Sequence, residues 1–371
     1  MNTLYYFNPI SVLRLSKEQD IANWGKLYNY INPNSSLVDR AEVFKQPVNV
    51  SLYHRCHIPP PQAQSLTYKD CCDLRAKQLW DKSNELQKSL GLMWSGGIDS
   101  TLMVVSFLEN YPLHELKDKI KIITSEEAVI ENREFYYNYI LPNFELVNAE
   151  HLPWLYDGRY ILVDGDLNDQ LFGPGMIRVY VLDHPDAFTR PISRDAIYNY
   201  INKKIGDTYI SKILVDAVFE SSEAYGFQLE RDVDWFWWWN FCFKWQSTWF
   251  IKLTLCAPKL RYMLTEKFVE DYVPHFFDTP EFQLWSINNP QVRTLTKWTD
   301  HKWEAKLQIY NFDKNEEYLN TKVKRGSLKT IFNQRLLFEA IGTDFNIIEK
   351  INPTDWYVPD TKFSKGNNNG S

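Results

Sequence analysis

Hydrophobic and polar positions alternate along residues 66–175 in a way that predicts helices and strands in turn. From Leu66 to Lys88, apolar residues recur at helical spacing, whereas Leu90–Trp94 is a short apolar run typical of a buried strand. The pattern predicts further strands at 120–124, 144–147 and 160–163, and helices at 100–110 and 126–141. Strands and helices that alternate at this spacing predict an α/β fold, with a Rossmann-like parallel sheet flanked by helices.

Beyond Pro174 the strand signals become sparse and most segments have helical spacing, among them 234–256 and 332–342. We therefore expect a largely helical C-terminal half. Before residue 66, clusters of Pro and Asn predict irregular structure. The chain accordingly divides into a short irregular N-terminal segment, a main domain that contains an insertion, and a C-terminal tail with a disordered polar end. Their bounds are 1–65, 66–345 with 174–234 inserted, and 346–371.

Composition then limits the class of protein. Aromatic residues make up 16% of the chain and apolar residues 44%, which is enough for a large packed core. A formal charge of −6 without long basic runs makes nucleic acid an unexpected partner. The five cysteines lack disulfide-framework spacing and the N-terminus is not signal-like, so we expect a cytoplasmic protein. Charged residues within Trp235–Leu255 argue against a membrane span, because buried charge is costly in lipid.

The most specific chemistry lies where the first strand is expected to end. Residues 95–101 read Ser-Gly-Gly-Ile-Asp-Ser-Thr, a glycine-rich turn that opens directly into a helix. Such a turn presents backbone N–H groups at the positive end of the helix, where they bind phosphate. The two glycines would let the backbone approach phosphate oxygens, and the two serine hydroxyls would add donors. Asp99 repels phosphate, so it is expected to act through Mg²⁺. An ordinary strand–helix turn is the alternative.

The stretch Ser95–Ser100 resembles the PP-loop of the ATP pyrophosphatases, which cleave ATP to AMP and pyrophosphate. It is not the common P-loop, because no Gly-Lys-Ser/Thr follows. The resemblance implies that this loop holds the pyrophosphate part of ATP. The residues expected to bind the nucleotide are Ser95, Gly96, Gly97, Asp99, Ser100, Thr101, Thr124 and Gly165.

A second acidic turn follows the strand expected at 160–163. Residues 164–173 read Asp-Gly-Asp-Leu-Asn-Asp-Gln-Leu-Phe-Gly and crowd three carboxylates together, at Asp164, Asp166 and Asp169. Carboxylates this close repel one another unless a cation or hydrogen-bond donors compensate. In a parallel sheet this turn meets the edge that carries the first motif, where such folds bind ligands. Asp99 and Asp169 are therefore expected to share Mg²⁺; a solvated acidic turn is the alternative.

The second turn resembles the S-G-x-G-x-D-E-x-F-G-G signature of the asparagine synthetase class, whose relatives include β-lactam synthetases and lasso-peptide cyclases. The resemblance implies that Asp169 binds the metal. It also implies that Asp166, which stands where the family has Glu, handles the substrate and the nitrogen nucleophile. Leu167 and Gln170 depart from the signature, which has Gly and an acid at these positions. Val273–Asp278 is similar, more faintly, to the V-P-F-L-D segment of the family.

The catalytic lysine of the family lies in an R-x-K stretch, after a helix that Lys302–Leu307 resembles. The nearest match is Lys322-Val323-Lys324, so the resemblance implies Lys324 as the catalytic lysine, with Lys322 in reserve. A cation there would neutralise the negative charge that develops during transfer. A solvated basic loop is the alternative.

The resemblance covers residues 68–175 and, more loosely, 235–330. It implies a ligase that uses ATP and Mg²⁺ to adenylate a small-molecule carboxylate and then forms an amide with ammonia or an amine. Asparagine synthetases begin with a glutaminase domain that has an N-terminal cysteine, whereas Asn2 follows Met1 here. The nitrogen source is thus expected to be free ammonia, an amine, or a separate ammonia-supplying subunit.

Two other functions stay open at this stage. One is a PP-loop enzyme that modifies nucleobases or tRNA, for which Cys242 or Cys256 would supply a reactive thiol. The other is a non-catalytic relative that binds ATP.

Two further groups of residues each have a functional and a structural interpretation. The spacing of the Cys–His cluster is not that of a zinc site; its members are His54, Cys56, His57, Cys71 and Cys72. The run Trp235–Trp239 either lines a substrate pocket or packs a helical core, and we expect the core.

Overall fold

The computed structural model describes residues 39–43, 56–173, 176–293 and 300–322. Most of the N-terminal segment, the helix expected at 332–342 and the C-terminal tail lie outside these residues. Within the described ranges, no helix combines the length and the apolar character that crossing a membrane requires.

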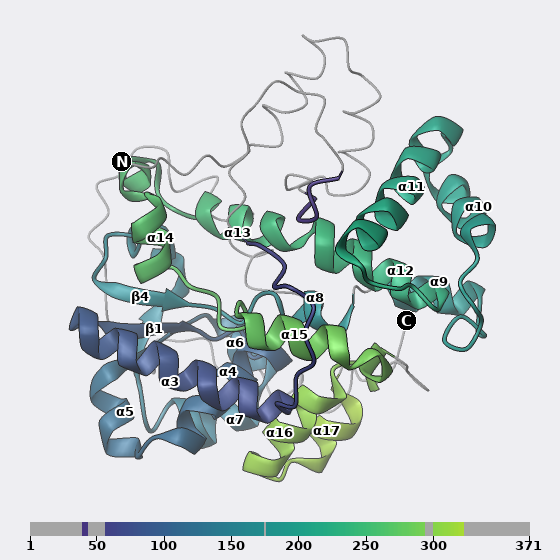
Figure 1. Ribbon diagram of the computed structural model, residues 1–371. Helices are drawn as coiled ribbons and strands as arrows, with labels where there is room; N and C mark the ends of the chain where they lie inside the picture. Colours follow the sequence, from purple (N-terminus) through teal and green to yellow (C-terminus); the bar gives the residue numbers. More distant parts are fainter. Residues whose placement is uncertain (1–38, 44–55, 174–175, 294–299, 323–371) are drawn as a thin grey trace.

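Four parallel strands form the sheet around which the chain is built (Figure 1). β1 (Ser89–Met93) pairs with β2 (Ile120–Thr124) on one side and with β4 (Tyr160–Val163) on the other. β3 (Glu145–Asn148) pairs with β2, which gives the order β3-β2-β1-β4. The predicted α/β class is therefore confirmed. Because the strand order reverses beside β1, the carboxyl ends of β1 and β4 flank the crevice where open α/β sheets bind ligands.

Helices flank this sheet, and the first of them shows how local sequence sets their limits. α3 (Tyr68–Leu86) begins after Thr67, and the side chains of Thr67 and Asp70 each accept a hydrogen bond from the other's backbone N–H. The helix ends at Gln87, which is left-handed at φ 52°. The helices and helical turns up to residue 172 are α4 (Ile98–Asn110), α5 (Leu113–Lys119), α6 (Glu126–Glu131), α7 (Arg133–Phe135), η1 (Tyr136–Ile140), η2 (Ala149–Trp154) and α8 (Asn168–Phe172).

The single helix predicted for 126–141 is wrong, because the segment is broken into α6, α7 and the π-helix η1. Asn132 leaves helical geometry at φ −147° and ψ 73°, and its side chain accepts a hydrogen bond from Phe135 N–H at 3.4 Å. A short polar side chain that caps a new helix competes with the helix that precedes it. Ala128, Glu131 and Asn132 lie against Gly96 of the glycine-rich loop described below.

The C-terminal half is helical, as expected, and includes the insertion predicted at 174–234. In the insertion, α10 and α11 pack on each other as a hairpin that projects from one side of the molecule (Figure 1). The elements are α9 (Met176–Asp183), α10 (Arg194–Ile205), α11 (Thr208–Tyr225), α12 (Asp232–Trp238), η3 (Trp239–Phe243), α13 (Trp245–Thr254), η4 (Pro258–Met263), α14 (Glu266–Tyr272), α15 (Pro280–Asn288), η5 (Pro290–Arg293), α16 (Trp303–Asp313) and α17 (Glu316–Thr321).

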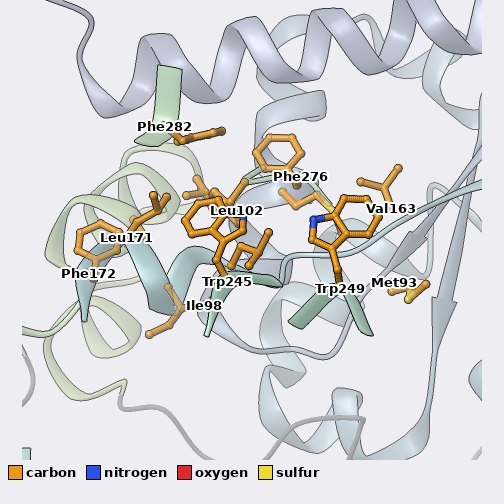
Figure 2. Packing of buried hydrophobic residues seen from close by; sticks show 14 of the residues in the cluster. Met93, Ile98, Leu102, Val163, Leu171, Phe172, Trp245, Trp249, Phe276 and Phe282 are labelled. Carbon is orange, nitrogen blue, oxygen red and sulfur yellow. The ribbon is translucent and has the colours of Figure 1, made fainter. Parts of the chain in front are cut away.

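The tryptophan run Trp235–Trp239 packs the core, as expected, and each of its side chains is buried. The run spans α12 and the start of η3, a π-helix that joins α12 to α13. On α13, Trp245 and Trp249 pack near Leu102 of α4 and Phe276 (Figure 2). This apolar contact fixes α13 across the end of the sheet from which the two acidic motifs project.

Candidate functional site

The glycine-rich loop follows β1 and leads into α4, as the sequence predicts. Ser95 N–H donates to Ser100 Oγ at 3.0 Å, and the two serine hydroxyls lie 3.0 Å apart, so they brace the loop from within. Gly97 is the residue before α4 and has no side chain to accept from the first N–H groups of the helix. Those donors lie at the positive end of a 13-residue helix, which favours an anion there.

Three glycines in the two motifs differ in what an added side chain would meet. A Cβ on Gly96, which has φ 71°, would overlap the carbonyl oxygen of Ala128 in α6. A Cβ on Gly165 would lie 2.8 Å from the backbone of Asp99 and of Ser100, so this glycine lets the two motifs touch. Only Ser95 Oγ, at 3.3 Å, lies near the corresponding position on Gly97. The backbone open to a ligand is therefore at Gly97, whereas a side chain at Gly96 would meet α6. Nucleotide binding by Gly96 stays a prediction.

A cavity of about 290 Å³ lies between the ends of β1, β2 and β4 and the face of α13. Eight of the residues expected from the sequence line it: Ser95, Gly97, Asp99, Ser100, Gly165, Asp166, Asp169 and Lys322. Apolar residues also line it, among them Met93, Ile123, Ala149, Leu152, Ile251 and Leu255. A cavity lined by apolar residues together with a few charged groups is typical of sites for small molecules.

Three expected nucleotide contacts, Gly96, Thr101 and Thr124, are not among the cavity residues. Thr101 is buried beneath the loop, where its Oγ1 accepts a hydrogen bond from the Trp94 indole at 3.2 Å. Thr124 is fully buried at the end of β2. Both threonines are buried and neither lines the cavity, and their contact with a nucleotide stays a prediction. Lys324 lies outside the described residues, and its role stays a prediction.

Asp99 and Asp169 converge, and a lysine that the sequence analysis did not select joins them. Lys302 Nζ lies 2.5 Å from Asp99 Oδ2 and 2.5 Å from Asp169 Oδ1. The ammonium group is buried, with 1% of the side chain exposed. Asn168 donates from its amide to Asp99 Oδ1 at 2.7 Å, which fixes the other oxygen of that carboxylate. The two acids expected to share a cation are thus brought together around the ammonium group of Lys302.

These carboxylates fit a divalent cation. The side chains of Asp99 and Asp169 are 23% and 29% exposed, so each can be reached from the cavity. Carboxylate oxygens are the ligands that Mg²⁺ prefers, and Mg²⁺ usually keeps several waters and phosphate oxygens in addition to one or two carboxylates. The donor set therefore suits Mg²⁺ held together with a phosphate group, while metal binding itself stays a prediction.

Lys322, the reserve lysine, also lines the cavity. Its Nζ lies 2.5 Å from Glu131 Oε1 and donates to the Glu131 carbonyl oxygen at 3.0 Å. This contact ties the end of α17 to the end of α6, which covers the loop at Gly96. Lys322, the residue that follows the last turn of α17, is therefore held beside the glycine-rich loop.

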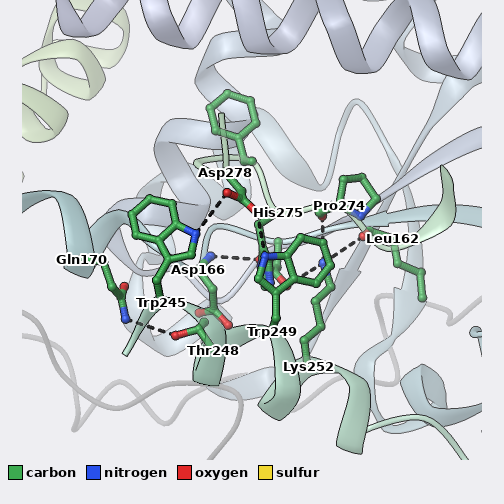
Figure 3. Close-up of polar contacts among 12 residues, drawn as sticks. Leu162, Asp166, Gln170, Trp245, Thr248, Trp249, Lys252, Pro274, His275 and Asp278 are labelled. Carbon is green, nitrogen blue, oxygen red and sulfur yellow. Dashed lines mark hydrogen bonds and ion pairs between the residues drawn. The ribbon is translucent and has the colours of Figure 1, made fainter. Parts of the chain in front are cut away.

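Asp164 is the centre of a second buried ionic group, drawn in part in Figure 3. Lys252 Nζ lies 2.8 Å from Asp164 Oδ2, and His275 Nδ1 lies 2.5 Å from Oδ1. Burial raises the pKa of Asp164, but the charges of His275 and Lys252 outweigh it and hold the pKa below its usual range. Asp166 N–H donates to Asp164 Oδ1 at 3.0 Å, so this ionic group fixes the turn that carries Asp166.

Asp164, Asp166 and His275 have ligand atoms within 4.8 Å of one another. The His275 nitrogen and the Asp164 oxygen are in direct hydrogen-bond contact, and Lys252 takes the other oxygen. Both oxygens of Asp164 thus have a nitrogen partner, so the contacts are those of an ion-pair cluster. Among the described members of the Cys–His cluster, Cys56, His57, Cys71 and Cys72, no comparable group forms.

The face of α13 is the part of the site that the sequence analysis missed. Thr248, Ile251, Lys252 and Leu255 recur at helical spacing and all line the cavity. Gln170 donates to Thr248 Oγ1 at 3.1 Å, so the departure from the family signature is used to bind α13 (Figure 3). Asp278 accepts from the indoles of Trp245 and Trp249 at 3.1 and 2.6 Å, which orients the same helix (Figure 3).

The chemistry of the cysteines bears on the thiol alternative. Burial raises the pKa of Cys256 to about 12, and it raises the pKa of Cys242 as well. Neither residue is among those that line the cavity. These two residues therefore do not provide a reactive thiolate at the cavity.

No family model, curated protein or solved structure matches the chain.

Proposed function

We propose that this chain is an ATP-dependent ligase of the asparagine synthetase class, which adenylates a carboxylate and transfers the acyl group to ammonia or an amine. The observation that carries the proposal is the convergence of Asp99 and Asp169 at the mouth of an open glycine-rich loop. A nucleoside triphosphate requires a turn that binds phosphate and, at the same edge of the sheet, a pair of acids that suits Mg²⁺.

The charge of the cavity supports a nucleotide that arrives with a metal ion. Among the described lining residues, five carboxylates face three lysines, which leaves two negative charges in excess. His301, next to Lys302, adds no charge, because burial and the neighbouring ammonium group lower its pKa to about 3. A bare triphosphate would be repelled by this cavity. Bound Mg²⁺ would neutralise phosphate charge and hold the pyrophosphate group as it leaves.

The residues of the chain would divide the remaining work. The N–H groups at Gly97 and the start of α4 would hold the phosphates, and the apolar residues that line the cavity would hold the adenine. Lys322 would stabilise negative charge on the pyrophosphate. Asp166, fixed by its bond to Asp164, would orient the acyl group and the incoming nitrogen nucleophile.

In the proposed reaction a substrate carboxylate oxygen attacks the α-phosphorus of ATP, and the bond to the pyrophosphate oxygen breaks. The nitrogen nucleophile then attacks the acyl carbon of the acyl-adenylate, AMP leaves, and the nitrogen gives up a proton. Catalysis of both steps is mostly positioning and charge neutralisation, which the geometry of the cavity is suited to supply.

Exchange of labelled pyrophosphate into ATP tests the proposal. The purified chain would be incubated with Mg²⁺, ATP, labelled pyrophosphate and pools of carboxylic acids, and AMP would be measured alongside. Exchange that requires one acid pool and is lost in Asp99→Asn, but not in the exposed control Asp195→Asn, is the expected result. Nucleotide binding without exchange or AMP from any pool would instead favour the non-catalytic relative.

A further inference from the structure

Lys302 stands where a metal ion between Asp99 and Asp169 would stand. Its nitrogen is 2.5 Å from an oxygen of each carboxylate, so those oxygens are at most about 5 Å apart. A Mg²⁺ ion needs oxygens at about 2.0–2.1 Å, and it would use the same two carboxylates. We propose that the Lys302 ammonium group is a built-in occupant of the metal position, which Mg²⁺ must displace when the nucleotide binds.

The two cations exclude each other on electrostatic grounds. Asp99 and Asp169 provide two negative charges, which one divalent ion neutralises completely and one ammonium group neutralises by half. An ammonium group and a divalent ion held a few ångströms apart by the same oxygens would repel each other strongly in a buried site. Metal binding therefore requires that Lys302 leave at least one of the carboxylates.

The backbone holds Lys302 in place for this role. Lys302 is left-handed at φ 58°, directly before α16, and a residue with a Cβ adopts this conformation only at a cost. α16 packs against α4, which carries Asp99 in its first turn (Figure 1). The packing of α16 on α4 thus brings the Lys302 side chain to the acid pair.

The inference has a consequence for the order of binding and rests on the proposed function for the identity of the nucleotide. Without nucleotide, Lys302 competes with the metal. Phosphate oxygens give the displaced ammonium group a new anionic partner, so the nucleotide and the metal should each strengthen the binding of the other. The acid pair would then be kept from binding a metal ion before its substrate arrives.

Binding of Mn²⁺ without nucleotide tests the inference, with electron paramagnetic resonance of free Mn²⁺ as the readout. Lys302→Met should bind one Mn²⁺ at least about tenfold more tightly than the wild type, because a competing charge is removed. Adding Asp169→Asn to that variant should abolish the gain. Equal affinity in the wild type and in Lys302→Met, or a gain that survives Asp169→Asn, would overturn the inference.

The control is Lys69→Met, which also removes a lysine that joins two carboxylates. Lys69 Nζ lies 2.8 Å from Asp73 and 3.2 Å from Glu109, but its side chain is 48% exposed. The change in net charge is identical, and the affinity for Mn²⁺ should not change. Since no nucleotide or acyl substrate is present, the outcome is independent of whether the ligase reaction is correct.

A second measurement on the wild type covers the case that Lys302→Met does not fold. Amine acetylation of the folded protein, followed by peptide mass spectrometry, should modify Lys302 slowly because the side chain is buried. Saturating Mn²⁺ alone should increase its rate several-fold, whereas Lys252, buried in the other ionic group, should keep its rate. An unchanged rate at Lys302 under saturating Mn²⁺ would overturn the inference.

Discussion

Replacing Gly165 by Ala tests how the two motifs are joined. The new Cβ would lie 2.8 Å from the carbonyl carbon of Asp99 and from the amide nitrogen of Ser100. Both are backbone atoms, so the clash cannot be relieved by a change of rotamer. The turn after β4 must then move away from the start of α4 by a few tenths of an ångström or more. Overpacking of this kind costs about 1–3 kcal/mol of folding free energy.

The matched change is Gly97→Ala in the other motif. There the nearest atom is the Ser95 hydroxyl oxygen at 3.3 Å, and the backbone is not left-handed, so the fold should accommodate the methyl group. The methyl group would nevertheless stand at the open N-terminus of α4. We expect Gly97→Ala to keep its stability within about 0.5 kcal/mol, as surface substitutions usually do, and to bind Mg²⁺–ATP more weakly.

Urea unfolding followed by circular dichroism measures the free energy of unfolding. Calorimetric titration with a non-hydrolysable ATP analogue and Mg²⁺ measures the affinity for the nucleotide. Gly165→Ala should lose both stability and affinity, whereas Gly97→Ala should lose affinity alone. If Gly165→Ala unfolds at the wild-type urea concentration and binds the analogue equally well, the contact between the two motifs is not what positions the site.

Three further predictions concern single side chains. Lys252→Met should lower the free energy of unfolding at pH 7 by about 3–5 kcal/mol, because it leaves Asp164 buried with one partner fewer. The folded-state pKa of Asp164 is below its ordinary value near 4, so the ionised Asp164 stabilises the fold above that pH, and this stabilisation is lost as the pH falls. Urea unfolding should therefore show a smaller loss of stability on Lys252→Met at pH 3 than at pH 7. An equal loss at both pH values would contradict this. Lys322→Met should weaken binding of the ATP analogue about tenfold, because a charged hydrogen-bond donor is lost. The control Lys314→Met, at an exposed lysine, should bind it as the wild type does. Equal affinity of Lys322→Met and the wild type would show that Lys322 does not belong to the site. Burial raises the pKa values of Cys71 and Cys256 to about 12, so iodoacetamide at pH 8 should label these thiols only after unfolding. Rapid labelling of Cys256 in the folded protein would favour the thiol alternative.

The local parts of the fold and site could be predicted from sequence. The strands at 120–124 and 160–163 have the predicted bounds, because each is a short apolar run bordered by polar residues. Asp99 and Asp169 were expected to converge, since both follow parallel strands and such strand ends share one edge of the sheet.

The parts that depend on packing could not be predicted. Lys302 reaches the acid pair only because α16 packs on α4, and nothing next to it in the sequence indicates that contact. Gly96 was assigned to the ligand, and the sequence does not indicate that its missing side chain also makes room for α6. A signal did exist for α13: Thr248, Lys252 and Leu255 follow helical spacing, and a buried lysine on an apolar helix face indicates an ionic partner.

The most direct test of the central claim is a crystal structure of the chain soaked with Mn²⁺ and a non-hydrolysable ATP analogue, in which anomalous scattering locates the metal. The account predicts one Mn²⁺ at ligand distance from both Asp99 and Asp169, with the β- and γ-phosphates at the N–H groups of Gly97 and the start of α4. A metal bound elsewhere, or phosphates away from this loop, would contradict it.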